Sequence, residues 1–340
     1  MSEYTKEWLS LDQQVEKLAQ RGVDVAPRET TAELLARIGY YRLTGYLYPF
    51  RNSEQFTDED RKVRTIVLND YKPGASIRHV ARVIDFDRRL RMLVMDGVER
   101  IEVAARMRVG YVLGHRSAFA HLDPRAFLPS FVEHQTDRET GWRTRPSKHA
   151  EWLGRVAERR DRSDEAFVAH FRDKYDGQMP IWALTEILEL GHLSRLYQGL
   201  NDDDAAEIAQ AFGVPTKRLL ANWLASVNYV RNVAAHHARL FNRKLQYAPS
   251  RPMAGVVPLL DHLRTDDTPK GVFGVYNALA VIAYLVRSID GDTDWCRRLV
   301  ALLDTFPSAP DLSIAALGVP QGWASLDLWS PRNASTASGR

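Results

Sequence analysis

FDRRLRMLVMDGVERIEVAAR, residues 86–106, lies at the centre of the strongest pattern in the chain. Between residues 76 and 113, apolar and small residues recur in steps of three and four, with arginines and acidic residues between them: Val83, Phe86, Leu90, Leu93, Gly97, Ile101 and Ala104. This spacing predicts one long amphipathic helix, with an interruption near Gly97 as an alternative. At 1.5 Å per residue the helix would extend roughly 50–60 Å, which is typical of the spine of a bundle or of a subunit interface.

The remaining elements are also predicted to be helical. Helical spacing and helix-start signals predict further helices near 10–21, 30–43, 151–176, 181–200 and 203–212, from Pro215, and near 254–264, 271–287 and 293–306. Thr30 or Thr31 is the expected N-cap of the second helix. The polar stretches 52–75 and 122–150 are predicted to be loops, and strand signals are few. We therefore predict an all-α fold.

The predicted helices and loops divide the chain into four segments. They are an N-terminal helical block with an aromatic cluster (1–70), a helical core (71–250), C-terminal helices packed on the core (251–330), and a disordered tail (331–340). No internal repeat is evident.

Charge is distributed unevenly along the chain. The formal net charge of the 340 residues is only +3, and a composition of 45% apolar and 26% charged residues is ordinary for a globular protein. Residues 231–251, however, contain five basic residues and no acidic one: Arg231, Arg239, Arg243, Lys244 and Arg251. Such a patch suits a phosphate-bearing partner, and a solvated basic surface is an equally good interpretation of the charge alone.

Cysteine usage and hydropathy indicate the compartment. Cys296 is the only cysteine, which excludes an internal disulfide and a cysteine-based metal cluster. No apolar segment follows Met1, and the longest apolar run, residues 271–286, is short for a bilayer span. We expect a cytoplasmic protein without a membrane segment.

RNVAAHHARL, residues 231–240, contains the most suggestive polar cluster. An apolar stripe over 219–238 predicts that the cluster lies on a helix, where Asn232 and His236 share a face. Arg231 would lie about 140° around the axis from His236, and its long side chain could still reach the same pocket edge.

These residue types fit cleavage of RNA without a metal. Histidine can remove the 2′-hydroxyl proton or protonate the leaving 5′-oxygen near neutral pH. Arginine can bind the phosphate and stabilise the transition state, and asparagine can orient the histidine or bind a phosphate oxygen. One histidine cannot easily be base and acid at once, which favours two copies of the site meeting across a dimer.

The Arg-x4-His spacing is weak evidence on its own, since it occurs a second time at Arg116–His121. A helix whose alanines pack against a neighbour is the simpler interpretation of the pattern alone.

A resemblance to a known family supports a functional role for the motif at residues 231–240. The run from Arg231 to Asn242 resembles the signature of bacterial abortive-infection proteins of the AbiD/AbiF type. Four other stretches in the same order also resemble blocks of that family: residues 40–51, 86–106, 180–197 and 318–329. The chain departs from the family at Ala235 and Phe241, where cysteine and tryptophan are common.

The resemblance implies more than the spacing does. The family is similar to the HEPN superfamily of α-helical, commonly dimeric proteins, many of which use an Arg-polar-x3-His motif as a metal-independent ribonuclease. It implies a HEPN-like helical bundle, with Arg231, Asn232 and His236 as the catalytic residues and no cofactor or metal. The role of His237 is not fixed by the motif, and Arg116–His121 has no family support and is interpreted as a decoy.

RNA-binding candidates surround the motif. Tyr40, Tyr41, Tyr46, Tyr48 and Phe50 cluster around Arg42 and could stack on single-stranded RNA, although core packing is the favoured interpretation. The predicted RNA contacts are His237, Arg239, Arg243, Lys244, Tyr41 and Arg42.

Other polar residues have simpler interpretations. Glu102–Arg106 and Asp96–Arg100 are predicted to be helix-surface ion pairs, with Glu99 or Arg100 facing the active cleft as a weaker alternative. His192 is interpreted as an interior or edge histidine.

Three functions remain open at this point. The first is a homodimeric endoribonuclease of phage defence, which cuts host or phage RNA to 2′,3′-cyclic phosphate and 5′-hydroxyl ends. The second is a module that holds a structured small RNA without cutting it. The third is a scaffold that pairs with partners through the long helix.

Overall fold

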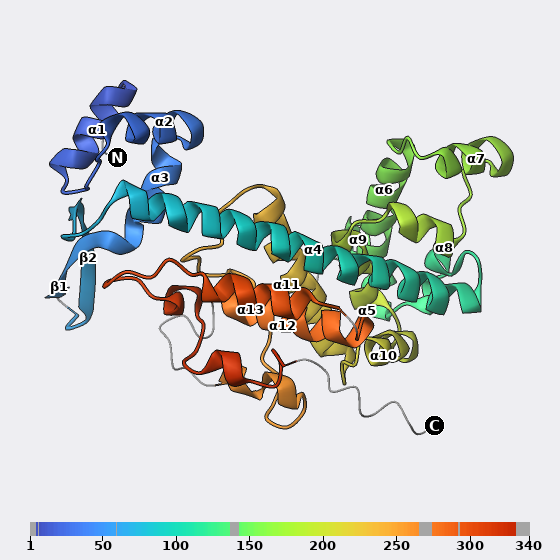
Figure 1. Cartoon of the computed structure of the whole chain (residues 1–340). Helices are drawn as coiled ribbons and strands as arrows, with labels where there is room; N and C mark the ends of the chain where they lie inside the picture. Colours follow the sequence, from blue (N-terminus) through green and yellow to red (C-terminus); the bar gives the residue numbers. More distant parts are fainter. Residues whose placement is uncertain are drawn as a thin grey trace.

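The computed structural model describes residues 5, 7–58, 60–136, 143–264, 274–291 and 293–330. Within them the fold is predominantly helical, as predicted. Figure 1 shows one long helix, α4 (Ile77–Arg116), with a lobe at each end and the C-terminal helices packed along it. Helices of both lobes rise on the same side of α4, whereas the hairpin of the N-terminal lobe lies on the other side. The molecule is therefore U-shaped, with α4 as its floor.

Helix α4 confirms the prediction from the long amphipathic pattern. The Ser76 side chain caps it by accepting a hydrogen bond from the His79 N–H, and it continues without a break for 40 residues. The alternative of an interruption at Gly97 is wrong. A Cβ at that position would lie 2.7 Å from Cε2 of Trp295 and 2.8 Å from Cγ2 of Ile282, so the glycine permits close approach of the C-terminal helices.

The N-terminal lobe differs from the prediction in two ways. It contains α1 (Leu11–Gln20), α2 (Arg28–Ile38), α3 (Tyr40–Leu47), the 3-10 turn η1 (Tyr48–Phe50) and a hairpin of β1 (Arg51–Thr57) and β2 (Val63–Tyr71). The single helix predicted over 30–43 is two helices, because Gly39 has φ +78°. The predicted Thr30 or Thr31 cap is also wrong, since α2 begins after Pro27 and the Thr31 hydroxyl donates to the Val25 carbonyl.

The hairpin replaces a predicted loop. Its strands pair antiparallel, with Ser53 opposite Val67 and Thr57 opposite Val63. Most of its side chains are exposed on both faces, so the sequence lacks the apolar alternation from which a half-buried strand is predicted.

The second lobe and the connection to it contain short elements. They are η2 (Ala120–Leu122), η3 (Pro124–Ala126), α5 (Pro129–Val132), the two-stranded ladder of β3 (Gln135–Thr136) and β4 (Arg143–Arg145), α6 (Lys148–Asp161), α7 (Ala166–Tyr175), α8 (Ile181–Leu184), η4 (Thr185–Ile187), α9 (Leu190–Gly199) and α10 (Asp202–Ala211). The helical runs predicted over 151–176 and 181–200 are thus each divided, and the loop predicted over 122–150 contains short helices and a ladder.

The C-terminal part completes the core. It contains α11 (Lys217–Ala235), η5 (Pro258–Arg264), α12 (Val275–Ile289), α13 (Trp295–Asp304), η6 (Ile314–Leu317) and η7 (Trp323–Ser325). The apolar run in α12 is buried, as predicted, whereas 254–264 forms only a 3-10 turn. Residues 271–273 of the predicted helix and the tail 331–340 lie outside the described residues.

One hydrophobic cluster of buried side chains runs through all three predicted blocks. Their division into separate units stays a prediction. No helix in the described ranges combines the length and hydropathy needed to cross a bilayer.

Candidate functional site

Asn232 and His236 are predicted to share a face of one helix, but the helix that carries the motif ends one residue before His236. Helix α11 begins after the Thr216 cap and its last residue is Ala235, so His236 is the C-cap. The His236 N–H still donates to the Asn232 carbonyl at 3.0 Å, which keeps the two residues one turn apart along the helix axis. The position of His236 relative to Arg231 therefore depends on the helix cap as well as on the rotation per residue of the helix.

His237 closes this helix end. It has φ +55°, and its N–H donates to the Ala234 carbonyl while the Ala238 N–H donates to the Val233 carbonyl, both at 3.0 Å. These two bonds form a Schellman motif with histidine at the position that glycine usually occupies. The motif fixes the backbone around His236, and both His236 and His237 are exposed.

A buried carboxylate holds the loop that follows. Asp87 of α4 accepts hydrogen bonds from the Phe241 N–H at 2.7 Å and the Tyr46 hydroxyl at 2.6 Å, and it forms an ion pair with Arg91. Burial raises the pKa of Asp87, against the opposing effects of Tyr46, Arg91 and the Phe241 N–H. Burial and the neighbouring Asp87 also raise the pKa of Tyr46 to about 12. Sequence blocks from α3, α4 and the motif thus meet at one carboxylate.

The predicted basic contacts differ in their surroundings. The Arg239 guanidinium lies over the Tyr46 ring, 5.7 Å from its centroid, and burial lowers its pKa. Arg243 donates from Nε to the Arg239 carbonyl at 2.6 Å, and Lys244 is exposed. Arg239 and Arg243 therefore help to fasten the loop, and their contact with RNA stays a prediction.

The aromatic cluster is divided between core and surface. Tyr46 and Phe50 are buried, in line with the packing interpretation. Tyr41 is 77% exposed, Tyr48 is about half exposed, and Arg42 beside them is half-buried. Tyr41 and Arg42 are the members of this cluster that remain candidates for contact with a ligand.

Arg231 and Asn232 contact each other and face different spaces. Nη1 of Arg231 donates to Oδ1 of Asn232 at 3.2 Å. Arg231 borders a hollow of about 530 Å³ along α4, together with Glu99 and Glu102. Glu102 pairs with Arg106 at 2.6 Å and Asp96 with Arg100 at 3.4 Å, as predicted.

Of the two candidates for the active cleft, Glu99 thus lies beside Arg231. Arg100 instead pairs with Asp96 and Asp290.

The second Arg-x4-His pair has a different environment. Arg116 forms an ion pair with Asp204 at 2.6 Å. His121 is buried, and burial, with a smaller contribution from His149, lowers its pKa to about 4. A buried neutral imidazole cannot exchange protons with a substrate phosphate at the surface, which favours the interpretation of this pair as a decoy.

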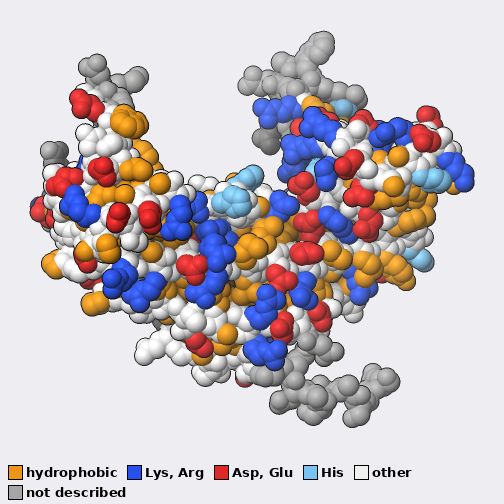
Figure 2. Space-filling view, turned by 45° about the horizontal axis from the view of Figure 1, so that its top comes forward, with side chains coloured by type: hydrophobic (Ala, Val, Ile, Leu, Met, Phe, Trp, Pro, Cys, Tyr) orange, Lys and Arg blue, Asp and Glu red, His pale blue; other side chains and the backbone are white. Residues whose placement is uncertain are grey.

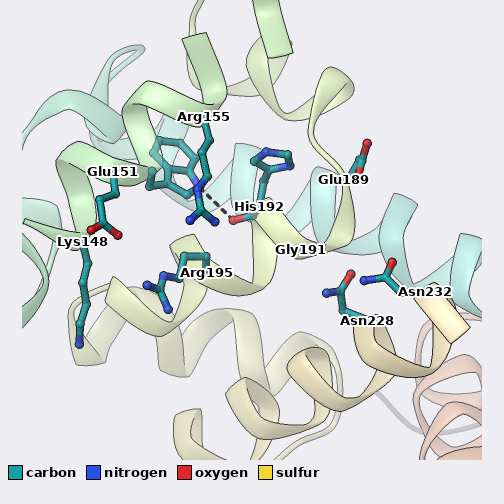
Figure 3. A pocket seen from close by; sticks show the side chains of 10 residues that line it. Lys148, Glu151, Arg155, Glu189, Gly191, His192, Arg195, Asn228 and Asn232 are labelled. Carbon is teal, nitrogen blue, oxygen red and sulfur yellow. Dashed lines mark hydrogen bonds between the residues drawn. The ribbon is translucent and has the colours of Figure 1, made fainter. Parts of the chain in front are cut away.

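Sequence reasoning missed a polar cavity next to the motif. Asn232 borders a cavity of about 470 Å³ between α6, the start of α9 and α11, which Lys148, Arg155 and Arg195 also line. Figure 3 shows Asn228 and Asn232 side by side on one wall and the two arginines opposite them. The only sequence signal is the pair of asparagines four apart on α11, because the cations come from two other helices.

The surface around the motif is concave. Figure 2 shows a hollow between the two lobes, with histidine side chains on its floor and Lys and Arg side chains beside them. Among the described residues, no group of three or more His, Cys, Asp or Glu side chains is arranged to hold a metal ion.

Comparison with protein families finds a match over a range that includes residues 231–236. The family model described as Abi-like protein matches residues 33–242, which is more than half of the chain and ends at the loop after His236. No curated protein and no solved structure matches the chain. The match includes the aromatic block of α3, the whole of α4 and all of α11. The chain therefore belongs to the Abi-like family of abortive-infection proteins, which act in phage defence.

Proposed function

We propose that the protein is a metal-independent endoribonuclease. The observation that carries this proposal is the end of α11, where an exposed His236 is fixed by the helix cap one turn beyond the hydrogen-bonded pair Arg231–Asn232. An exposed imidazole, a guanidinium and an amide on one rigid helix end are the groups that RNA transesterification needs.

The reaction uses these groups as follows. The 2′-oxygen of the substrate attacks the adjacent phosphorus and loses its proton to a base, and the bond to the 5′-oxygen breaks as an acid protonates that oxygen. His236 serves as one of these proton-transfer groups. Arg231 binds the phosphate and stabilises its extra negative charge, and Asn232 orients Arg231 through their hydrogen bond. The products are a 2′,3′-cyclic phosphate and a 5′-hydroxyl.

A second copy of the chain would supply the other proton-transfer group. Four apolar side chains on one face of α4 are each between 49% and 65% exposed: Met92, Val103, Met107 and Tyr111. Met92 and Val103 also border the hollow that contains Arg231. An exposed apolar stripe beside the motif is typical of an interface, and pairing two copies through it would bring two motifs together.

The test is cleavage of RNA in the presence of EDTA. Wild type is expected to give 5′-hydroxyl ends, and His236→Ala and Arg231→Ala are expected to lower the rate at least a hundredfold, since each removes a group used in the transition state. His115→Ala is the matched control, because His115 is also exposed but lies at the far end of α4. Cleavage that persists in both motif variants would exclude this assignment.

An RNA-binding function without cleavage is the second candidate. The exposed Tyr41 beside Arg42 and the basic residues after His236 favour it, because aromatic and cationic side chains hold single-stranded RNA. A gel shift followed by recovery of the RNA separates the two: intact RNA with strong salt-dependent retention supports the binding module. The scaffold hypothesis instead expects phage defence in cells to survive both motif substitutions.

A further inference from the structure

The cavity beside Asn232 has the features of a nucleotide site. Its volume of about 470 Å³ lies within the range of small-molecule pockets. One wall is the buried ring of Trp152, whose Nε1 donates to the His192 carbonyl at 3.0 Å, the dashed line in Figure 3. This bond joins α6 to the start of α9, so the cavity is preformed.

Cations line one side of the cavity. Lys148 and Arg155 come from α6 and Arg195 from α9, and within the described part of the chain none of the three forms an ion pair. Figure 3 shows the guanidinium groups of Arg155 and Arg195 directed into the same space, while the carboxylate of Glu189 points away from it. Glu151 also borders the cavity, so the lining is mixed in sign and its positive charge is concentrated at the two arginines. Two unpaired guanidinium groups are suited to a phosphate.

Amides form the opposite wall. Asn228 and Asn232 are four apart on α11, so their side chains share a face of the helix. Each amide offers a donor and an acceptor, which is the pattern that pairs with the edge of a nucleobase. The cavity therefore presents phosphate-binding groups on one side and base-binding groups on the other.

The cavity also borders one residue of the motif, Asn232. Oδ1 of Asn232 accepts the hydrogen bond from Arg231, while the Asn232 side chain borders the cavity. A nucleotide in the cavity would thus be a neighbour of the phosphate at Arg231.

From these contacts we infer that the cavity holds one nucleotide of a bound RNA, next to the phosphate that is cut. Arg155 and Arg195 hold its phosphate, and Asn228 and Asn232 contact its base. This inference rests on the proposed function for the position of the scissile phosphate, whereas binding itself can be measured without cleavage.

The first test measures binding of a fluorescent 2′-O-methyl RNA, which cannot be cleaved because its 2′-oxygens carry no proton. The double variant Arg155→Gln/Arg195→Gln is expected to bind at least tenfold more weakly than wild type. The slope of log affinity against log salt should become shallower by roughly 0.7 for each phosphate that is no longer neutralised. Arg172→Gln on α7 is the matched control, an exposed arginine outside the cavity that should leave binding unchanged. Equal affinity of the double variant and wild type would overturn the inference.

The second test concerns the base. Asn228→Ala is expected to change the preference among 2′-O-methyl homopolymers of A, C, G and U by fivefold or more. An unchanged preference would overturn the assignment of base contact to this wall.

A third measurement needs no variant. Wild type irradiated with an RNA containing 4-thiouridine should form crosslinks within α6, the first turn of α9 or residues 228–232. Crosslinks found only elsewhere would overturn the inference.

A free nucleotide carries the same phosphate and base groups as a nucleotide within RNA, so it is the alternative ligand for the cavity. Millimolar AMP, GMP, CMP and UMP should compete with the RNA for the cavity. If a mononucleotide binds wild type but leaves RNA affinity unchanged, the cavity is a site for free nucleotide and the RNA assignment is wrong. If the variants weaken binding while wild type never cleaves unmodified RNA, the proposed ribonuclease fails and the nucleotide site stands.

Discussion

His237 is a residue whose backbone matters apart from its side-chain chemistry. Its φ of +55° is unfavourable for residues with a Cβ and easy for glycine. We expect His237→Gly to raise the free energy of unfolding by up to about 1 kcal/mol, and His237→Val to lower it by about 1–2 kcal/mol. Urea denaturation checks both values. A valine variant as stable as wild type would show that the helix end adopts another conformation.

His121 makes stability depend on pH. Its pKa of about 4 in the folded protein is below the usual 6.5, so the unfolded chain binds more protons between these values. Stability should therefore fall as the pH is lowered from 6.5 towards 4, by up to about 3 kcal/mol from this residue. Urea denaturation at pH 7 and pH 4.5 is expected to show a smaller loss of stability for His121→Gln than for wild type. The same loss in both proteins would exclude His121 as the source.

Among the elements, the helices could be predicted and their ends could not. The three- and four-residue spacing predicted α4 because one face of that helix is buried along its whole length. The spacing could not predict the break at Gly39 or the end of α11 at His236, where histidine closes the cap at a position that glycine usually occupies. The hairpin was missed because its exposed strands lack a buried face.

Substitutions at two glycines would distinguish the effect of helix propensity on stability from the effect of packing. Gly97 in α4 and Gly154 in α6 are both in helix interiors, but only Gly97 contacts another element. Gly154→Ala should stabilise the protein by about 0.5–1 kcal/mol, since alanine is the better helix former. Gly97→Ala should destabilise it by about 1–3 kcal/mol, because the new methyl group would overlap Trp295. Thermal unfolding of both variants checks this contrast, and two changes of the same sign would contradict it.

For the whole molecule, the candidate site was predictable in part. The motif residues Arg231, Asn232 and His236 follow from one stretch of chain and a family resemblance. The cavity beside them does not, because Arg155, Arg195 and Asn228 come from three helices that only the fold brings together. Likewise, the sequence suggested Arg239 as an RNA contact but could not show that it lies over Tyr46.

The exposed stripe on α4 leads to a prediction about assembly. If two copies pair through it, Met107→Glu should convert a dimer to a monomer, because the new carboxylate would be buried against apolar side chains. Sedimentation velocity at micromolar concentration is the measurement, with Arg172→Gln as the variant that leaves the mass unchanged. RNA cleavage should fall together with dimer formation. A monomeric wild type with full activity would rule out the shared site.

The carboxylate of Asp87 has one more consequence, for truncated forms of the chain. The Tyr46 hydroxyl and the Phe241 N–H both donate to this carboxylate, and Tyr46 lies about forty residues before Asp87 in the sequence. A protease that trims the chain back past residue 50 would remove that phenol without touching the motif. The shortened protein would keep His236 but lack one of the anchors of the segment behind it, so N-terminal processing would loosen that segment from a distance.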